Sequence, residues 1–122
     1  MRILVLSLVT IMGLLAWHGP GAAASIYDPP IERHLALTPD QRPHVEKILS
    51  QSRQQFRAVF HAHGIDPYGP PIFRQLVRAS SELQAIARQQ RRELRKVLRP
   101  DQFAEYNRIM RDTRARIRAA AQ

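Results

Sequence analysis

Apolar residues recur three or four positions apart in three long stretches of this chain. Such spacing predicts an amphipathic helix that buries one stripe of its surface. The first stretch runs from Thr38 to about His63, and Gly64 is a natural stop after it. The stripe expected to be buried there comprises Val45, Ile48, Leu49, Phe56, Val59 and Phe60, with Ser52 in the remaining slot.

Two further stretches follow a proline-rich connector at residues 65–71. The second predicted helix, from about Ile72 to Leu98, has a buried stripe of Ile72, Leu76, Ala79, Leu83, Ile86, Ala87, Gln90, Leu94 and Val97. The third helix begins after the second and carries Phe103, Tyr106, Met110 and Ile117 on one face. No stretch alternates as a strand does, so the sequence predicts an all-α chain with three main helices.

A short phrase occurs twice, 61 residues apart, and each copy stands where a long helix is expected to begin. The copies are Leu37-Thr38-Pro39-Asp40-Gln41 and Leu98-Arg99-Pro100-Asp101-Gln102. Proline at the first helical position needs no N–H donor, aspartate suits the positive end of the helix dipole, and glutamine can bond back to the N–H of the cap residue. The phrase therefore predicts helix starts. We expect Pro43 to make the first turn irregular, and the second helix to end or bend before Pro100.

The first residues read as a secretory signal peptide. Ile3 to Trp17 is an apolar run, and Ala22-Ala23-Ala24 offers a cleavage site after a helix-breaking Gly19-Pro20-Gly21. The alternative is an uncleaved membrane anchor, for which the apolar run is short. The expected organisation is a signal peptide at residues 1–24, an extended arm with one short turn at residues 25–36, and a helical domain at residues 37–122. We therefore expect a periplasmic protein.

Basic residues outnumber acidic ones by 19 to 10, which gives a formal net charge of +9. Such an excess is typical of proteins that meet nucleic acid or anionic surfaces. Export argues against nucleic acid as the natural partner, and leaves membrane head groups, acidic proteins and unfolded chains. The chain has no cysteine, so it forms no disulfide and no thiol site. A domain this small would be stabilised by a partner subunit.

The second predicted helix carries most of its positive charges on the side opposite its apolar stripe. They occupy an arc of roughly 140° at about 100° per residue. Like charges four residues apart cost about 0.2–0.5 kcal/mol per pair, so this face either awaits an acidic partner or is a solvated surface. The expected client- or partner-binding residues, with two arginines of the first helix included, are Arg53, Arg57, Arg88, Arg91, Arg92, Arg95 and Lys96.

His61 and His63 are the candidate metal ligands. Residues two apart on a helix point in different directions, so this spacing favours surface histidines, and no cofactor is expected. Zinc or another divalent metal bound at this helix end is the alternative. The sequence has no glycine-rich phosphate loop, no cysteine nucleophile and no serine elbow, so we do not expect an enzyme.

Residues from Leu35 to about Ile117 resemble the Spy/CpxP family of periplasmic proteins, which carries paired Leu-Thr-x-x-Gln motifs. The matching segments are the two phrases and the amphipathic helices beside them. The resemblance implies a long, bent helical hairpin that dimerises in antiparallel fashion into a thin, curved cradle. It also implies that a basic concave face meets the client. Arg99 departs from the motif, which has Thr there, and so removes a hydroxyl cap.

Three functions follow as hypotheses. The first is an ATP-independent, chaperone-like envelope-stress protein, a homodimer that binds unfolded or envelope proteins or a stress-sensor domain. The alternative, from a related branch of the family, is a periplasmic sensor or scavenger of zinc, nickel or cobalt that uses His61, His63 and either His34 or His44. The third is a membrane-surface protein whose basic face meets anionic lipid.

Overall fold

The computed structural model describes residues 25–122, and this part of the chain is helical without any strand. Its helices are α2 (Ile31–His34), α3 (Arg42–Ala62), α4 (Phe73–Val97) and α5 (Pro100–Ala120). The all-α prediction is confirmed, with three long helices and a short helical turn before them. The signal peptide expected at residues 1–24 lies outside the described residues.

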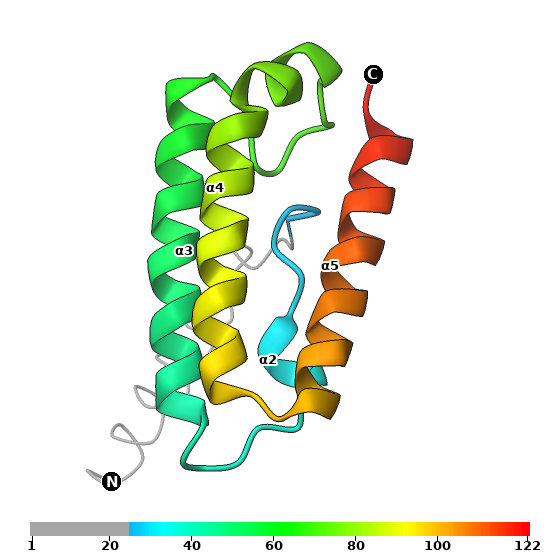
Figure 1. Cartoon of the computed structure of the whole chain (residues 1–122). Helices are drawn as coiled ribbons and strands as arrows, with labels where there is room; N and C mark the ends of the chain where they lie inside the picture. The colour runs from blue at the N-terminus through cyan, green and yellow to red at the C-terminus, as the bar shows by residue number, and fades with distance from the viewer. Residues whose placement is uncertain (1–24) are drawn as a thin grey trace, which may run out of the picture.

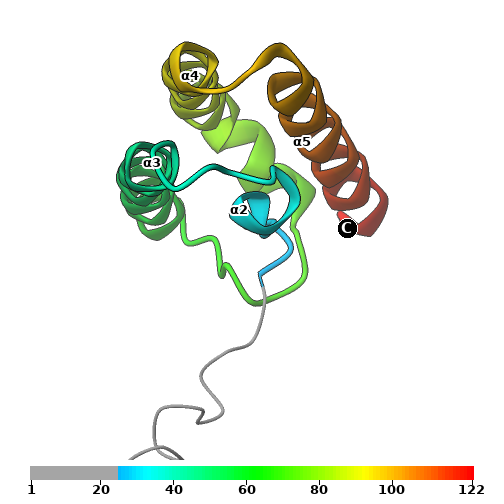
Figure 2. The ribbon, with the colours of Figure 1, turned by 90° about the horizontal axis from the view of Figure 1, so that it is seen from below.

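The long helices form a hairpin with a third helix beside it. α3 and α4 run antiparallel and pack against each other along their length, whereas α5 turns back beside α4 with much less contact (Figure 1). α2 lies in the space between α3 and α5, as the view along the helices shows (Figure 2). The short helix therefore fills a space that α5, held apart from α3, would otherwise leave open.

The first motif starts α3 through a reciprocal cap. The N–H of Gln41 donates to Oγ1 of Thr38 over 3.2 Å, and the N–H of Thr38 donates to Oε1 of Gln41 over 3.1 Å. Regular helix begins at Arg42 rather than at Thr38 as expected from the sequence. The reason is Pro43, which has no N–H to donate to the turn before it. The predicted irregular first turn is thus confirmed, and the predicted helix start was four residues early.

The second motif separates α4 from α5. Leu98 has a ψ of 146° and Arg99 a ψ of 159°, both extended, and α5 begins at Pro100. The ring of a proline disfavours helical conformation in the residue before it, so the chain must leave the helix at this point. The predicted end of the second helix is confirmed.

The connector between α3 and α4 has the conformation that the sequence predicts, except at Ile72. Gly64 has a φ of +67°, the left-handed conformation that commonly ends a helix. Ile72 was expected on the buried stripe of α4, but it precedes the helix and is 46% exposed. Its extended backbone takes it out of the helical register on which that expectation relied.

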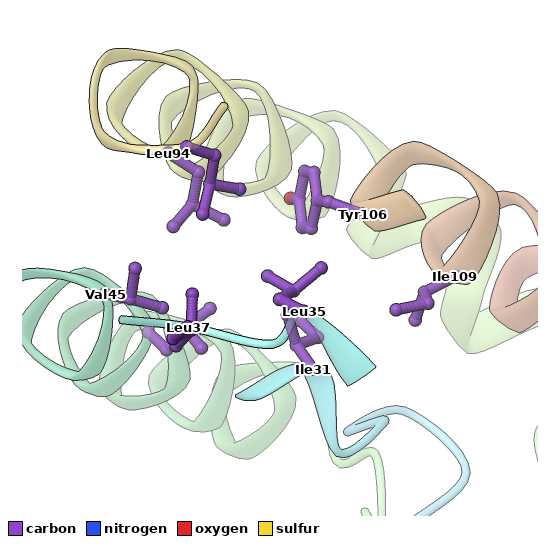
Figure 3. Close-up of a cluster of buried hydrophobic side chains, with 9 residues drawn as sticks. Ile31, Leu35, Leu37, Val45, Leu94, Tyr106 and Ile109 are labelled. Atoms are coloured by element: carbon purple, nitrogen blue, oxygen red, sulfur yellow. The ribbon is translucent and has the colours of Figure 1, made fainter. Parts of the chain in front are cut away.

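The main hydrophobic core lies beside the two motifs, where all four helices converge (Figure 3). Val45 and Leu49 of α3 and Leu94 of α4 are fully buried, and Tyr106 of α5 is 1% exposed. The whole cluster comprises Ile31, Leu35, Leu37, Val45, Leu49, Leu94, Leu98, Tyr106 and Ile109. Short-range helix signals and the deepest packing therefore coincide at this end of the molecule.

A smaller cluster lies further along the hairpin, around Phe60, Ile65 and Ala79. The ring of Tyr27 packs at 4.9 Å from that of Phe60, centroid to centroid. Ile31 and Leu35 of α2 belong to the main core. Residues 25–36, expected as an extended arm, thus share both clusters with the long helices and form one body with them.

Candidate functional site

The two sequence motifs meet in space through their glutamines. Nε2 of Gln41 donates to Oε1 of Gln102 over 2.8 Å, and Nε2 of Gln102 donates to Oε1 of Gln41 over 3.0 Å. Gln102 is 2% exposed and Gln41 is half-buried. Each amide therefore satisfies the other where water has little access, which is the condition for a stable buried polar pair.

Each glutamine also holds the cap residue of its own motif. Oε1 of Gln41 accepts the N–H of Thr38, and Oε1 of Gln102 accepts the N–H of Arg99 over 2.9 Å. Thr38 returns the bond through its hydroxyl, but arginine has no acceptor atom and Arg99 cannot. The second motif thus forms only one of the two hydrogen bonds that the first motif forms, as the sequence predicted from the missing hydroxyl.

The remaining amide hydrogens cross over to the backbone of the other motif. Nε2 of Gln41 donates to the carbonyl of Val97 over 3.0 Å, and Nε2 of Gln102 donates to the carbonyls of Leu35 and Ala36 over 3.1 and 3.3 Å. Ala36 has a φ of 50°, unusual for a residue with a side chain, and so turns the chain into the first motif. Ala36 and Val97 occupy equivalent positions, each directly before the leucine of its motif. The two copies of the phrase therefore bind each other in a nearly symmetrical way and join the starts of α3 and α5.

A second buried polar chain connects the three long helices. The hydroxyl of Tyr106 donates to Oε1 of Gln90 over 2.6 Å, and Nε2 of Gln90 donates to Oγ of Ser52 over 2.7 Å. All three side chains are buried. Burial raises the pKa of Tyr106 to about 12, against the opposing effect of nearby arginines. The phenol therefore stays neutral and fixes the position of α5 relative to α4 and α3.

The positive charges expected on the second helix lie exposed on α4. The five residues predicted there are all exposed and are here named the cationic surface: Arg88, Arg91, Arg92, Arg95 and Lys96. Glu93 lies among them, with its Oε1 3.4 Å from Nζ of Lys96. The guanidinium groups of Arg91 and Arg95 lie over the ring of Phe103, at 5.7 and 5.8 Å from its centroid. Such cation–π contacts orient the two arginines without neutralising them.

Arg53 is engaged elsewhere. Its Nε lies 2.9 Å from Oδ1 of Asp28, and its Nη1 lies 2.6 Å from Oε1 of Glu32. Burial opposes the ionisation of Glu32, but the hydrogen bonds from Arg53 outweigh it and hold the pKa of Glu32 below its usual value. Arg53 therefore fastens the N-terminal arm to α3, and Arg57, one turn further on, is exposed.

The two candidate metal ligands lie at the end of α3 and in the turn after it. His61 is exposed, and Nε2 of His63 lies 2.8 Å from Oε1 of Glu82 on α4. Within residues 25–122, no three His, Asp or Glu side chains are grouped so that they could hold a metal ion. The structure thus brings His63 to a single carboxylate, and a metal site at this helix end stays the untested alternative.

The structure contains a groove between α4 and α5 that the sequence did not predict. It has a volume of about 940 Å³, and both helices contribute apolar residues and arginines to its walls. Tyr106 and Thr113 of the buried face of α5 also border it. Nothing in the local sequence marks this groove, because it depends on how far α5 diverges from α4.

Comparisons of the chain with protein-family models, with curated proteins and with solved structures find no match. Among residues 25–122, no helix combines the length and the apolar character that crossing a membrane would require.

Proposed function

We propose that this chain is a periplasmic, ATP-independent chaperone-like protein that binds unfolded or partly folded envelope proteins. The observation that carries the proposal is the cationic surface of α4, where five basic side chains are exposed and a single acidic residue lies among them. An exposed charge cluster of this kind opposes folding of its own helix by repulsion. A surface that is costly to maintain is better explained by a partner than by solvation alone.

Binding would proceed in two stages. The positive surface attracts acidic segments of an unfolded chain over distances of about 10 Å in 0.1 M salt. Apolar groups beside the arginines then hold the client loosely; Phe103, half-buried under Arg91 and Arg95, is the nearest of these. Weak, rapidly formed contacts of both kinds suit a protein that must release its client without ATP.

The resemblance to the Spy/CpxP family supports the same proposal. Both motifs that carry the resemblance lie in the joint between the helix starts, where Gln41 and Gln102 bond each other beside the point at which α5 leaves α4. In the proposed assembly, two copies of this bent unit form an antiparallel, cradle-like homodimer. A stress-sensor domain with an acidic surface is a further partner that the same cationic surface would recognise.

The proposal is tested by following the light scattering of an acidic client protein as it unfolds and aggregates. The variant Arg92→Glu/Lys96→Glu reverses two charges on one turn of the cationic surface. We expect at least fivefold more of this variant than of the wild type to be needed for equal protection, and we expect 1 M salt to weaken the wild type because the Debye length falls to about 3 Å.

The matched control is Arg74→Glu/Arg78→Glu, which makes the same change at the same spacing on α4, at exposed positions outside the cationic surface. This control is expected to protect as the wild type does. Equal protection by both variants, or an equal loss in both, would remove the cationic surface from the proposal. Circular dichroism of each variant confirms that the helices are intact.

A further inference from the structure

The groove between α4 and α5 is closed at both ends by the backbone. At one end the two helices are joined directly through Leu98 and Arg99. At the other end the N–H of Phe73 donates to the carbonyl of Gln122 over 2.9 Å, and the N–H of Gln122 donates to the carbonyl of Pro71 over 3.1 Å. Between these points α5 stands away from α4 (Figure 1). The groove is therefore a bounded slot.

The interior of the slot is apolar and partly aromatic. Its lining includes Phe56, Phe60, Leu76, Leu83, Met110 and Ile117. At its edge Phe73 and Val77 are 64% and 54% exposed, which leaves apolar surface in contact with water. A volume of about 940 Å³ falls within the range of about 300–1,000 Å³ found for small-molecule sites. These features fit an apolar ligand of limited length.

Among the described residues, every charged side chain that lines the slot is cationic. Arginines line it from both helices, at Arg88, Arg91, Arg111, Arg114 and Arg118, and all five are exposed. No acidic side chain of the described residues lines it. Two acids of α5, Glu105 and Asp112, pair instead with Arg108, which lies outside the slot. The ligand that fits is therefore apolar along most of its length and negatively charged at one end.

We propose that this slot binds a long-chain fatty carboxylate, with the acyl chain between α4 and α5 and the carboxylate against Arg111 and Arg114. These two arginines are three residues apart on α5 and so project from neighbouring positions of one face. A guanidinium group can bind a carboxylate through two parallel hydrogen bonds. Each further methylene group buried in the slot would strengthen binding about fourfold.

The structure favours an acyl chain over a helix of another protein and over a second copy of this chain. A helix about 10–12 Å wide would have to enter sideways between two ends that the backbone closes. In a twofold dimer the same patch of each copy meets its counterpart. The five arginines of one copy would then face the same five of the other, which is electrostatically unfavourable.

This site shares Arg88 and Arg91 with the cationic surface, but the proposed carboxylate ligands Arg111 and Arg114 lie outside that surface, and Arg92, Arg95 and Lys96 do not line the slot. The inference therefore does not depend on chaperone activity. The variant Arg92→Glu/Lys96→Glu, expected to lose client protection, is expected to bind the fatty carboxylate as the wild type does.

The experiment is a fluorescence titration of the protein with cis-parinaric acid, a fluorescent long-chain carboxylate, and with its uncharged methyl ester. We expect saturable binding of one acid per chain. Arg111→Gln/Arg114→Gln should weaken binding of the acid about tenfold, equivalent to about 1.4 kcal/mol, and leave binding of the ester unchanged. Ala87→Trp, which fills the slot from α4, should abolish binding of both.

The control Arg74→Gln/Arg78→Gln removes two exposed charges of α4 that do not line the slot, and it should bind the acid normally. Failure of the acid to saturate, or an equal loss in this control, would overturn the proposal. So would a dimer seen by sedimentation that Ala87→Trp dissociates, since it would assign the slot to a second copy. The two exposed arginines can be changed without disturbing the core, so the test stands even where Ala87→Trp fails to fold.

Discussion

The side-chain amides of Gln41 and Gln102, 61 residues apart in the chain, bond each other in both directions. Each glutamine also binds the cap of its own helix and the backbone that leads into the other motif. The same glutamines that mark the helix starts therefore also connect distant parts of the chain. We call this pair of bonds between Gln41 and Gln102 the clasp. The clasp holds the point from which α4 and α5 diverge, and with it one end of the slot between them.

Replacing the buried partner of this clasp should be costly. Gln102→Ala removes the donor to the carbonyl of Leu35 and both bonds between the two amides in a site with little access to water. We expect a loss of about 2–3 kcal/mol in the free energy of unfolding, measured by urea denaturation. Gln54→Ala, at an exposed position of α3, is the matched control and should change stability by less than about 0.5 kcal/mol. Equal effects of the two substitutions would contradict the role assigned to the clasp.

Restoring a hydroxyl to the second motif should stabilise the protein. Arg99 occupies the cap position with extended backbone, φ −67° and ψ 159°, which a threonine adopts readily. Arg99→Thr lets the cap accept the N–H of Gln102, as Thr38 accepts that of Gln41, and should add about 1 kcal/mol. The reverse test, Thr38→Ala, should cost about the same amount. Thermal unfolding measures both, and unchanged or lower stability of Arg99→Thr would refute the assignment.

The two buried tyrosine hydroxyls should respond differently to removal. Tyr106→Phe deprives Oε1 of Gln90 of its donor and should cost about 1–3 kcal/mol. The hydroxyl of Tyr27 has no hydrogen-bond partner among residues 25–122, so Tyr27→Phe should be neutral or slightly stabilising. Urea denaturation of the two variants decides the matter, and a larger loss for Tyr27→Phe would show that the chain from Ser52 to Tyr106 has been misassigned.

The same phenol predicts how the protein responds to alkali. The pKa of Tyr106 is raised to about 12 from the usual 10.0 of a tyrosine, so the folded state holds its proton more tightly than the unfolded state does. The stability that depends on this proton is complete below about pH 10 and is lost as the pH rises toward 12. Absorbance titration should show a tyrosine ionising near pH 12 that is missing from Tyr106→Phe. A wild-type titration identical to that of the variant would contradict the prediction.

Loss of the Arg53 ion pairs should release the N-terminal arm. Arg53→Gln removes the partner of Asp28 and Glu32, and proteolysis within residues 25–35 should become several-fold faster. Arg57→Gln, one turn away on α3 and exposed, is the control and should leave the rate unchanged.

The same ion pairs predict an acid dependence of arm docking. The pKa of Glu32 is lowered in the fold, so its contribution is present at neutral pH and is lost as the pH falls from the ordinary pKa of a glutamate through the lowered one. Hydrogen exchange of the arm, measured across this range, should rise in the wild type and stay flat in Arg53→Gln. An acid-independent arm in the wild type would count against the pairing.

Much of the fold follows from local patterns. The buried positions of α3 were found from helical spacing, and Ser52 was correctly included. The face predicted for α5 is confirmed at Tyr106, and Phe103 and Met110 are partly buried against the core, but Gln102, Ile109 and Thr113, which were not predicted, are buried more deeply than those two. A search for apolar residues alone missed part of the buried face because two of its members are polar: Gln102 is satisfied by a bond to the carbonyl of Leu35, and Oγ1 of Thr113 accepts from Arg116 on the same helix.

The sequence by itself determined the helices, most of their ends and the charge of α4, because helical spacing, capping and the effect of proline act within a few residues. Only the tertiary structure decided that Gln41 meets Gln102, that Arg53 is occupied by the arm, and that α5 leaves an arginine-edged slot beside α4. These relationships join residues far apart in the chain. They depend on the angles at which whole helices pack, and no short segment encodes such an angle.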